Sequence, residues 1–319
     1  MLYPISRFRG GSPEQSVGFI DAGGVVRIEP RFASAGYFCE GKASVLEDGG
    51  LSGFINCRGQ IEIAPTFRGI SHFNEGVCMV GTETAIGYID HCGQWLIEPR
   101  FLIGMAFSEG RTFVSNDGES FHLVDMSGST VNEQSYERAR MTHAGLAPVM
   151  KDGVWGFVDR SGCVVIPFVF EDALAQHFLC GLAAVKVPGK WGFIDRLGDF
   201  VVKPYFDQVL PFSEGLAPVK LDEKWGVIDL AGRVRLQPRW DVLGQFVGGL
   251  ASATLAGKTG YINPTGSWAI EPTFDAARAF CGDLALVKIG GAPAYIRVDG
   301  TVVWEFEPHA IVPRPPVPI

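Results

Sequence analysis

The chain has 319 residues, of which 47% are hydrophobic and 19% are charged, and its formal net charge is −8. This balance predicts a folded protein with a buried core, and the negative charge argues against general nucleic-acid binding, which needs a basic surface. No apolar run approaches the roughly 20 residues that cross a bilayer, and the N-terminus lacks the features of a signal peptide. We therefore expect a cytoplasmic protein that binds neither nucleic acid nor membrane.

A unit of 34 to 36 residues recurs nine times along the chain. Its clearest copy runs from Gly189 to Ala217, with Trp191-Gly192 near its start. The counterparts of that pair are Val17-Gly18, Ser52-Gly53, Ile86-Gly87, Phe121-His122, Trp155-Gly156, Trp225-Gly226, Thr259-Gly260 and Pro293-Ala294. So regular a period is typical of a repeat array, in which each unit packs on its neighbours.

Each unit is predicted to form a meander of three short strands, which we name A, B and C in chain order. Strand A has the Leu-Ala-x-Val pattern of 216–219, and strand B has the Trp-Gly-Phe-Ile-Asp pattern of 191–195. An Asp-x-x-Gly turn then leads into strand C. The nine B strands are expected near 17–21, 52–56, 86–90, 121–125, 155–159, 191–195, 225–229, 259–263 and 293–297. The array is expected to span 1–306, and a proline-rich tail occupies 307–319.

Proline and glycine recur at fixed places in the unit. Strand C is expected to stop at a proline in seven units, because proline lacks the N–H that a sheet needs. These prolines are Pro30, Pro65, Pro99, Pro167, Pro204, Pro238 and Pro272. The glycine of strand B, such as Gly192, predicts a close neighbour, expected to be a ring or the backbone of the next unit. Aromatic residues after strand C, such as Phe206 and Phe212, are predicted to pack between units.

The sequence favours an open superhelix over a closed ring. Propeller blades usually have four strands, whereas this unit offers three. The first and last units also begin and end in phase, without the split blade that closes many rings. The favoured fold is therefore an all-β open superhelix or solenoid of about nine three-stranded units, and a closed β-propeller-like ring is the alternative.

The segments 190–195, 212–217 and 224–229 resemble bacterial WG (KWG) repeats. The resemblance covers nearly the whole chain, although six units lack the tryptophan at the position that gives the family its name. It implies an all-β repeat module of bacterial proteins, whose members are often interaction parts of stress-response or toxin–immunity systems. No catalytic residues belong to the repeat, so the resemblance implies none here.

The residues give no catalytic, metal or cofactor site. The sequence has no Gly-x-Ser-x-Gly, no phosphate-binding glycine loop and no His-Glu-x-x-His motif. The Asp-x-x-Gly series fits turn formation better than calcium binding, which needs six to eight converging oxygens. We therefore expect no enzyme activity and no cofactor.

The turns between strands A and B carry the best candidate site. Those of units two to five form an acidic rim, which is predicted to attract a basic protein partner. Its residues are Glu47, Asp48, Glu83, Asp117, Glu119 and Asp152. The leading hypothesis is a non-catalytic protein-binding scaffold, most concretely an immunity protein that captures a co-encoded toxin or effector. The alternative is a carbohydrate or cell-wall binding module that stacks sugar on Trp95, Trp240 or Trp268.

Overall fold

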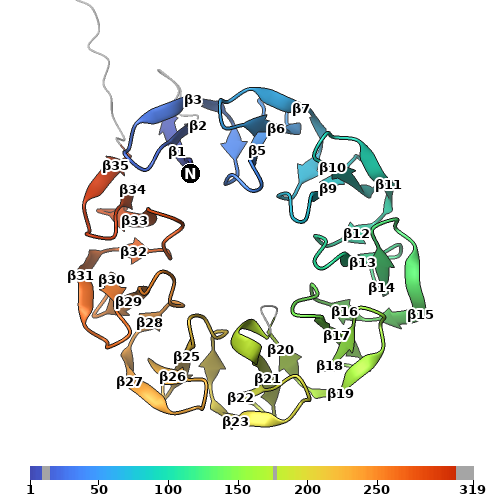
Figure 1. The fold of residues 1–319 in the computed structure, drawn as a ribbon. Coiled ribbons are helices and arrows are strands. Elements are labelled where there is room, and N and C mark those ends of the chain that lie inside the picture. The colour runs from blue at the N-terminus through green and yellow to red at the C-terminus, as the bar shows by residue number, and fades with distance from the viewer. Residues whose placement is uncertain (9–14, 175–177, 307–319) are drawn as a thin grey trace, which may run out of the picture.

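The computed structural model describes residues 1–8, 15–174 and 178–306 and shows a ring of nine small antiparallel sheets around a central channel (Figure 1). The proline-rich tail expected at 307–319 lies outside the described residues. We number the sheets as blades 1 to 9 in chain order. The prediction of nine all-β units is confirmed.

In the part of the chain that the structure describes, blade 1 has three strands, β1 (Tyr3–Phe8), β2 (Gln15–Ile20) and β3 (Val26–Phe32). The other blades have four, and the first of them, the inner strand, lies nearest the channel (Figure 1). The inner strands are β4 (Ser34–Ala35), β8 (Gly69–Ile70), β12 (Ile103–Gly104), β16 (Arg138–Ala139), β20 (Asp172–Ala173), β24 (Gln208–Val209), β28 (Val242–Leu243) and β32 (Ala276–Ala277).

Strands A, B and C follow outward in the same order in every blade. After β1, the A strands are β5 (Lys42–Leu46), β9 (Val77–Gly81), β13 (Arg111–Ser115), β17 (Leu146–Lys151), β21 (Ala183–Val187), β25 (Leu216–Leu221), β29 (Ala251–Leu255) and β33 (Ala285–Ile289). After β2, the B strands are β6 (Ser52–Asn56), β10 (Ile86–Asp90), β14 (Phe121–Asp125), β18 (Val154–Asp159), β22 (Lys190–Ile194), β26 (Lys224–Asp229), β30 (Lys258–Ile262) and β34 (Ala292–Ile296).

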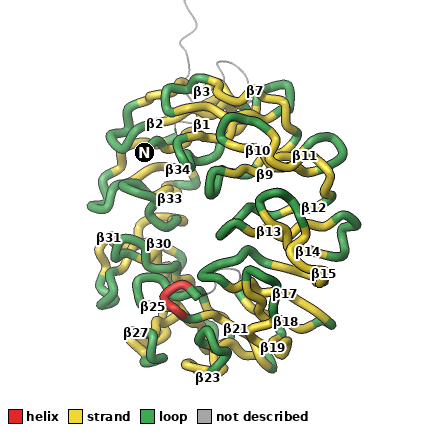
Figure 2. Tube along the Cα trace, turned by 45° about the vertical axis from the view of Figure 1, so that its right-hand side comes forward, coloured by secondary structure: helices red, strands yellow, loops and turns green. Residues whose placement is uncertain are grey.

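The C strands form the outer edge of each sheet. After β3, they are β7 (Ile61–Phe67), β11 (Trp95–Phe101), β15 (Thr130–Tyr136), β19 (Val164–Phe170), β23 (Phe200–Phe206), β27 (Val234–Trp240), β31 (Trp268–Phe274) and β35 (Val302–Glu305). Within the described residues the one helical element is the 3-10 turn η1 (Leu179–Gly181), drawn red in Figure 2.

The array closes on itself (Figure 1), so the alternative of a closed β-propeller-like ring is confirmed and the favoured open superhelix is wrong. The strand count was one short in blades 2 to 9: the residues after strand C of one blade form the two-residue inner strand of the next, so these blades have the four strands of a propeller blade. Closure needs no split blade. At the seam between blades 9 and 1, Tyr295 Oη donates to the carbonyl of Pro4 at 2.9 Å, and Tyr3 Oη accepts from the amide of Asp283 at 3.0 Å.

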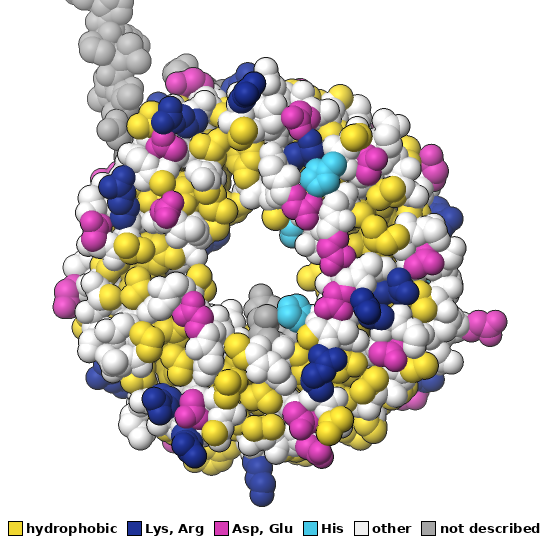
Figure 3. Space-filling model, viewed as in Figure 1, with side chains coloured by type: hydrophobic (Ala, Val, Ile, Leu, Met, Phe, Trp, Pro, Cys, Tyr) yellow, Lys and Arg dark blue, Asp and Glu magenta, His cyan; other side chains and the backbone are white. Residues whose placement is uncertain are grey.

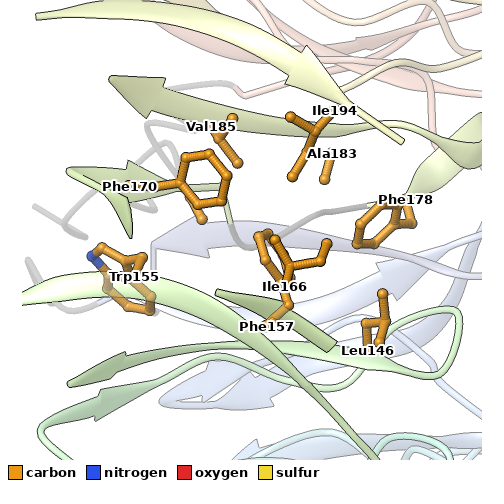
Figure 4. Packing of buried hydrophobic residues seen from close by; sticks show 10 residues of the cluster. Leu146, Trp155, Phe157, Ile166, Phe170, Phe178, Ala183, Val185 and Ile194 are labelled. Carbon is orange, nitrogen blue, oxygen red and sulfur yellow. The ribbon is translucent and has the colours of Figure 1, made fainter. Parts of the chain in front are cut away.

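The hydrophobic core lies between adjacent blades. In Figure 4, Phe157 and Phe170 of blade 5 face Ala183, Val185 and Ile194 of blade 6. Aromatic rings meet across these contacts as predicted. In each case a strand B ring packs against the linker ring of the next unit, with centroids 4.7 Å apart for Phe54 and Phe73, 4.9 Å for Tyr88 and Phe107, and 4.7 Å for Phe193 and Phe212.

Two expectations are wrong, one about the proline of strand C and one about the glycine of strand B. The strand does not stop at its proline but continues through it, as β23 does through Pro204. An outer edge tolerates proline because no further strand pairs with it. The neighbour of Gly192 is also not the next unit. A Cβ at residue 192 would lie 2.6 Å from the carbonyl oxygen of Val202 and 2.8 Å from the nitrogen of Pro204, both in strand C of the same blade.

The glycine of strand B and the proline of strand C therefore belong to one feature, a bulge of strand C over the glycine. Between β22 and β23, Trp191 pairs with Phe206 and Phe193 pairs with Val202, so strand C bulges over Gly192. The two units without this glycine also lack the proline, and there the pairing is direct: His122 pairs with Ser135, and Ala294 pairs with Glu305. The glycine is thus a packing requirement of the bulge.

Candidate functional site

The lysine of the repeat signature has a structural role on the face that carries the A–B turns. Lys258 in β30 pairs with Asp275 at 2.7 Å, and the second oxygen of Asp275 accepts from the amide of Gly291, in the A–B turn of the next blade, at 2.8 Å. The same arrangement joins Lys190, Asp207 and the amide of Asp222, and it joins Lys224, Asp241 and the amide of Ala256. Each aspartate therefore connects the A–B turns of two adjacent blades.

The opposite face carries the B–C turns and the loops between inner strand and strand A. Here glutamates at positive φ, such as Glu75 at 54°, connect neighbouring loops. Glu75 accepts from the amides of Glu109 and Gly110 in the next unit, and Glu109 accepts from the amide of Gly145. Glu40 and Glu214 make the corresponding contacts with Gly76, and with Gly248 and Gly249. These carboxylates stabilise the ring and are not free to bind a partner through the same oxygens.

All six residues of the predicted acidic rim are exposed and lie in A–B turns, each between strands A and B of its own blade. The structure does not bring them together as one cluster, because successive turns belong to successive blades. Asp117 is held by its own turn: its Oδ1 accepts from the amides of Glu119 and Ser120, each at 2.8 Å, and these bonds lower the pKa of its carboxyl. Asp152 has φ of 52°, a turn conformation.

Arginines accompany the acidic residues along this face. Arg68 pairs with Glu83 at 2.7 Å, and the hydrogen bond lowers the pKa of that carboxyl. A hollow of about 420 Å³ is lined by Arg31 together with Glu47 and Asp48. Figure 3 shows one face of the ring, around which acidic and basic side chains are intermixed. The rim is therefore of mixed charge, a feature that the turn sequences alone did not predict.

Unit four, the most divergent copy, lines a second hollow. It measures about 500 Å³ and is lined by Glu119, Arg138, Arg140 and Trp155, among others. The guanidinium of Arg140 lies 4.4 Å from the ring centroid of Trp155 and pairs with Asp172 at 3.0 Å. The positive charge of Arg140 is thus already partnered.

The described residues contain no group of three His, Cys, Asp or Glu side chains placed to hold a metal ion. The same part of the chain has no helix that is both long and apolar enough to span a membrane.

The three tryptophans proposed to stack on sugar differ in exposure. Trp240 is buried at 1% exposure, and Trp268 packs against the core cluster of blades 7 and 8. Trp95 is 36% exposed and packs edge-on against Phe67, with ring centroids 5.9 Å apart. A sugar platform needs an exposed ring face, so these positions do not form a row of such platforms.

Blades 5 and 6 carry seven exposed apolar side chains in their outer strands and in the B–C turn of blade 6. We call this surface the outer apolar patch, and its members are 40 to 78% exposed: Val164, Val165, Val169, Leu197, Phe200, Val201 and Tyr205. The two strands adjoin, because the rings of Phe170 in β19 and Phe200 in β23 meet edge-on at 6.4 Å. The sequence did not predict this surface, because placing six of these residues in strand C does not show which face of the strand each one occupies.

A comparison between units would have revealed the outer apolar patch. Val169 and Tyr205 occupy the sixth position of strand C, which is exposed in all these strands. The other six units with a seven-residue strand C have polar or charged residues there, namely Arg31, Thr66, Arg100, Ser135, Arg239 and Thr273. Blades 5 and 6 are thus the exception.

Comparison with known proteins gives one family and many similar solved structures, two of which follow. The family model described as WG containing repeat matches residues 18–50, 53–81, 86–119, 155–191, 191–225, 225–258 and 260–291. A eukaryotic initiation factor is similar with a TM-score of 0.65 at 9% identity, covering 96% of each chain. The computationally designed protein Ika8 is similar with a TM-score of 0.51 at 13% identity, covering 83% of this chain and 93% of the other. At these identities the likeness shows the fold alone. No curated protein matches significantly.

Proposed function

Since this chain belongs to the family of WG-repeat proteins, and since the lysines and glycines of its repeat signature have structural roles, we propose that it is a non-catalytic scaffold that binds another protein. The outer apolar patch is the observation that carries this proposal. Soluble proteins seldom leave contiguous apolar surface uncovered, and larger patches mark sites of interaction. The rigid ring presents the patch without the cost of ordering a flexible surface on binding.

The more specific proposal is that the partner is a toxin or effector encoded beside this protein. Binding one to one would cover the active site of the partner and so neutralise it. The resemblance of the repeats to parts of toxin–immunity systems supports this choice. We place the complex in the cytoplasm and expect no part for nucleic acid or membrane.

The decisive experiment changes the outer apolar patch. Val169 and Tyr205 are both 60% exposed, so replacing them by aspartate leaves the core intact. For the double variant V169D/Y205D we expect affinity for the product of the neighbouring gene to fall at least about tenfold, as expected for a loss of more than 1.4 kcal/mol at an interface. The measurement is isothermal titration calorimetry, with circular dichroism to verify folding.

The matched control is V25D/V298D. These valines are similarly exposed, at 52% and 58%, but they lie in the B–C turns of blades 1 and 9, outside the patch. The control variant should bind like the wild type. Equal binding by both variants would remove the patch as the site. For the immunity role, the wild type should relieve growth inhibition by the partner, and V169D/Y205D should not.

The acidic rim has a separate role in this proposal, which is to accelerate association with a basic partner. We would replace Glu47, Asp48 and Glu119 by lysine and keep Asp117, because its carboxylate holds the turn. The expected result is a slower, less salt-dependent association rate in stopped-flow measurements, with a smaller change in dissociation. An unchanged association rate would exclude this role.

A further inference from the structure

The sixth position of strand C joins adjacent blades where it is arginine. Arg31, Arg100 and Arg239 each donate a hydrogen bond to the carbonyl of the glycine in the B–C turn of the next blade, at 2.7 Å for Arg100 and 2.8 Å for Arg239. Each guanidinium carbon also lies 4.4 to 5.0 Å from the centroid of the ring that follows it in the strand. An arginine at this position therefore adds a contact between blades.

Blades 5 and 6 have no arginine at this position, because it holds Val169 and Tyr205. The acceptor glycines are nevertheless present, as Gly198 and Gly232 in the B–C turns of the following blades. A hydrogen bond from a charged donor is stronger than one between neutral groups. The outer apolar patch thus occupies positions where a stabilising contact is available and is not used. Stability is given up in this way at sites that serve a function.

Lys203 is the one charged residue in the two C strands that carry the patch. It is exposed and lies in β23 between Val201 and Tyr205, which are 44% and 60% exposed. Among the eight C strands of seven residues, the fourth position is lysine in blade 6 alone. The others have neutral residues there or glutamate, namely Glu29, Glu98, Glu133 and Glu271. The patch therefore carries a positive charge where other blades have none.

The ammonium of Lys203 has no acidic partner within the described part of the chain. By contrast, Lys190, Lys224 and Lys258 are each paired with an aspartate. Water solvates Lys203 while the patch is open, but a protein that covers the neighbouring apolar side chains excludes that water. A charge buried in this way needs a partner of opposite charge.

The outer edges of β19 and β23 favour a partner that binds through its side chains. A free sheet edge can pair with a strand of another chain. Pro167 and Pro204 lie in these two strands, and each lacks the N–H that such pairing uses. The contact therefore rests on side chains that reach both strands, with a group opposite Lys203 that matches its charge.

We propose that Lys203 binds a carboxylate of the partner protein within the outer apolar patch. This inference rests on the proposed function, because it specifies the chemistry of the same surface. The partner segment carries an aspartate or glutamate flanked by apolar side chains. The acidic rim is a separate surface, formed by A–B turns, so a basic region of the same partner can face it.

The first test measures affinity for the product of the neighbouring gene by isothermal titration calorimetry. Lys203→Met keeps an apolar side chain and removes the charge. It should weaken binding at least about tenfold, because the partner carboxylate is left buried without a cation. Lys203→Arg should bind within a few fold of the wild type. Lys288→Met, at an exposed lysine of β33 in blade 9, is the matched control and should bind like the wild type.

The same measurements separate this proposal from the proposed function. If V169D/Y205D weakens binding and Lys203→Met does not, the patch remains the binding site and the proposal for Lys203 is overturned. If the wild type does not bind the product of the neighbouring gene, the proposed partner is wrong, and the chemistry of the patch is then tested without it.

That second test selects random peptides from a display library on the immobilised wild-type protein. Peptides that V169D/Y205D fails to retain depend on the patch. They should share an aspartate or glutamate next to apolar residues, and Lys203→Glu should instead retain peptides with lysine or arginine at that place. Patch-dependent peptides without a common acidic residue would overturn the proposal, as would a selection that yields none.

Discussion

Gly192 and Pro204 lie on adjacent strands of blade 6 so close together that a Cβ on residue 192 would be 2.8 Å from the proline nitrogen. The contact is with backbone, which cannot rotate out of the way. Gly192→Ala should therefore destabilise the protein by about 1–3 kcal/mol, the usual cost of overpacking. Urea unfolding measures the loss.

The control for this change is Gly69→Ala. Gly69 lies in β8, has no atom within 4 Å of the position that its Cβ would take, and has no positive φ. Alanine there should change stability by less than about 1 kcal/mol, in the stabilising direction if the strand conformation suits it. Similar losses for Gly192→Ala and Gly69→Ala would mean that the bulge over Gly192 is not the cause.

Two substitutions of Asp275, which connects two A–B turns, distinguish the contribution of its charge from that of its hydrogen bond to the next turn. Asp275→Asn removes the ion pair with Lys258 but retains an oxygen that can accept from the amide of Gly291. Asp275→Ala removes both. Because exposed ion pairs contribute little, we expect Asp275→Asn to lower the Tm by no more than about 2 °C and Asp275→Ala to lower it further. Differential scanning calorimetry makes the comparison, and equal Tm values for the two variants would show that the turn hydrogen bond is without effect.

Acid should weaken the contacts that the three lysine-paired aspartates make between A–B turns. Hydrogen bonds from Lys190, Lys224 and Lys258 lower the pKa values of Asp207, Asp241 and Asp275. A carboxyl whose pKa is lower in the folded than in the unfolded state adds stability above the unfolded pKa, near 3.9, and loses it as the pH falls through the folded value. The wild type should therefore lose stability below about pH 4. The triple Asp→Asn variant should show a shallower loss over that window, as measured by urea midpoints at successive pH values. Parallel profiles would contradict the assignment.

The sequence predicted the units and their three long strands because residues such as Trp191 and Phe193 recur at a fixed period and alternate with the pleat. It did not predict the inner strands, because two residues such as Gln208-Val209 carry no periodicity. For the same reason the closed ring was only the alternative to an open superhelix, since a unit that lacks its fourth strand looks unlike a propeller blade. The bulge at Gly192 was attributed to the wrong neighbour, because a glycine shows that something lies close without showing which strand it is.

The candidate surfaces were likewise predicted only in part from the sequence. Turns are exposed wherever they occur, so the exposure of Glu47 and Asp152 followed from the strand assignment. The pairing of Arg68 with Glu83 did not, because it depends on how the start of a blade lies beside its A–B turn. The outer apolar patch was missed because Val169 and Tyr205 are apolar residues in strands, which usually indicates a core.

At the seam between blades 9 and 1, one side chain, that of Tyr3, makes both a ring contact and a hydrogen bond to the neighbouring blade. Tyr3 is fully buried, packs on Tyr295 and accepts from the amide of Asp283, where most other A strands have alanine or another small residue. Tyr3→Ala should cost about 3–5 kcal/mol, the range for removing a buried aromatic ring, and should increase amide exchange first in peptides from β1 and β34. Tyr205→Ala, at a residue that is 60% exposed, provides the control and should change stability by less than about 1 kcal/mol. Exchange that rises uniformly around the ring in Tyr3→Ala would show that the seam opens no more readily than the other contacts between blades.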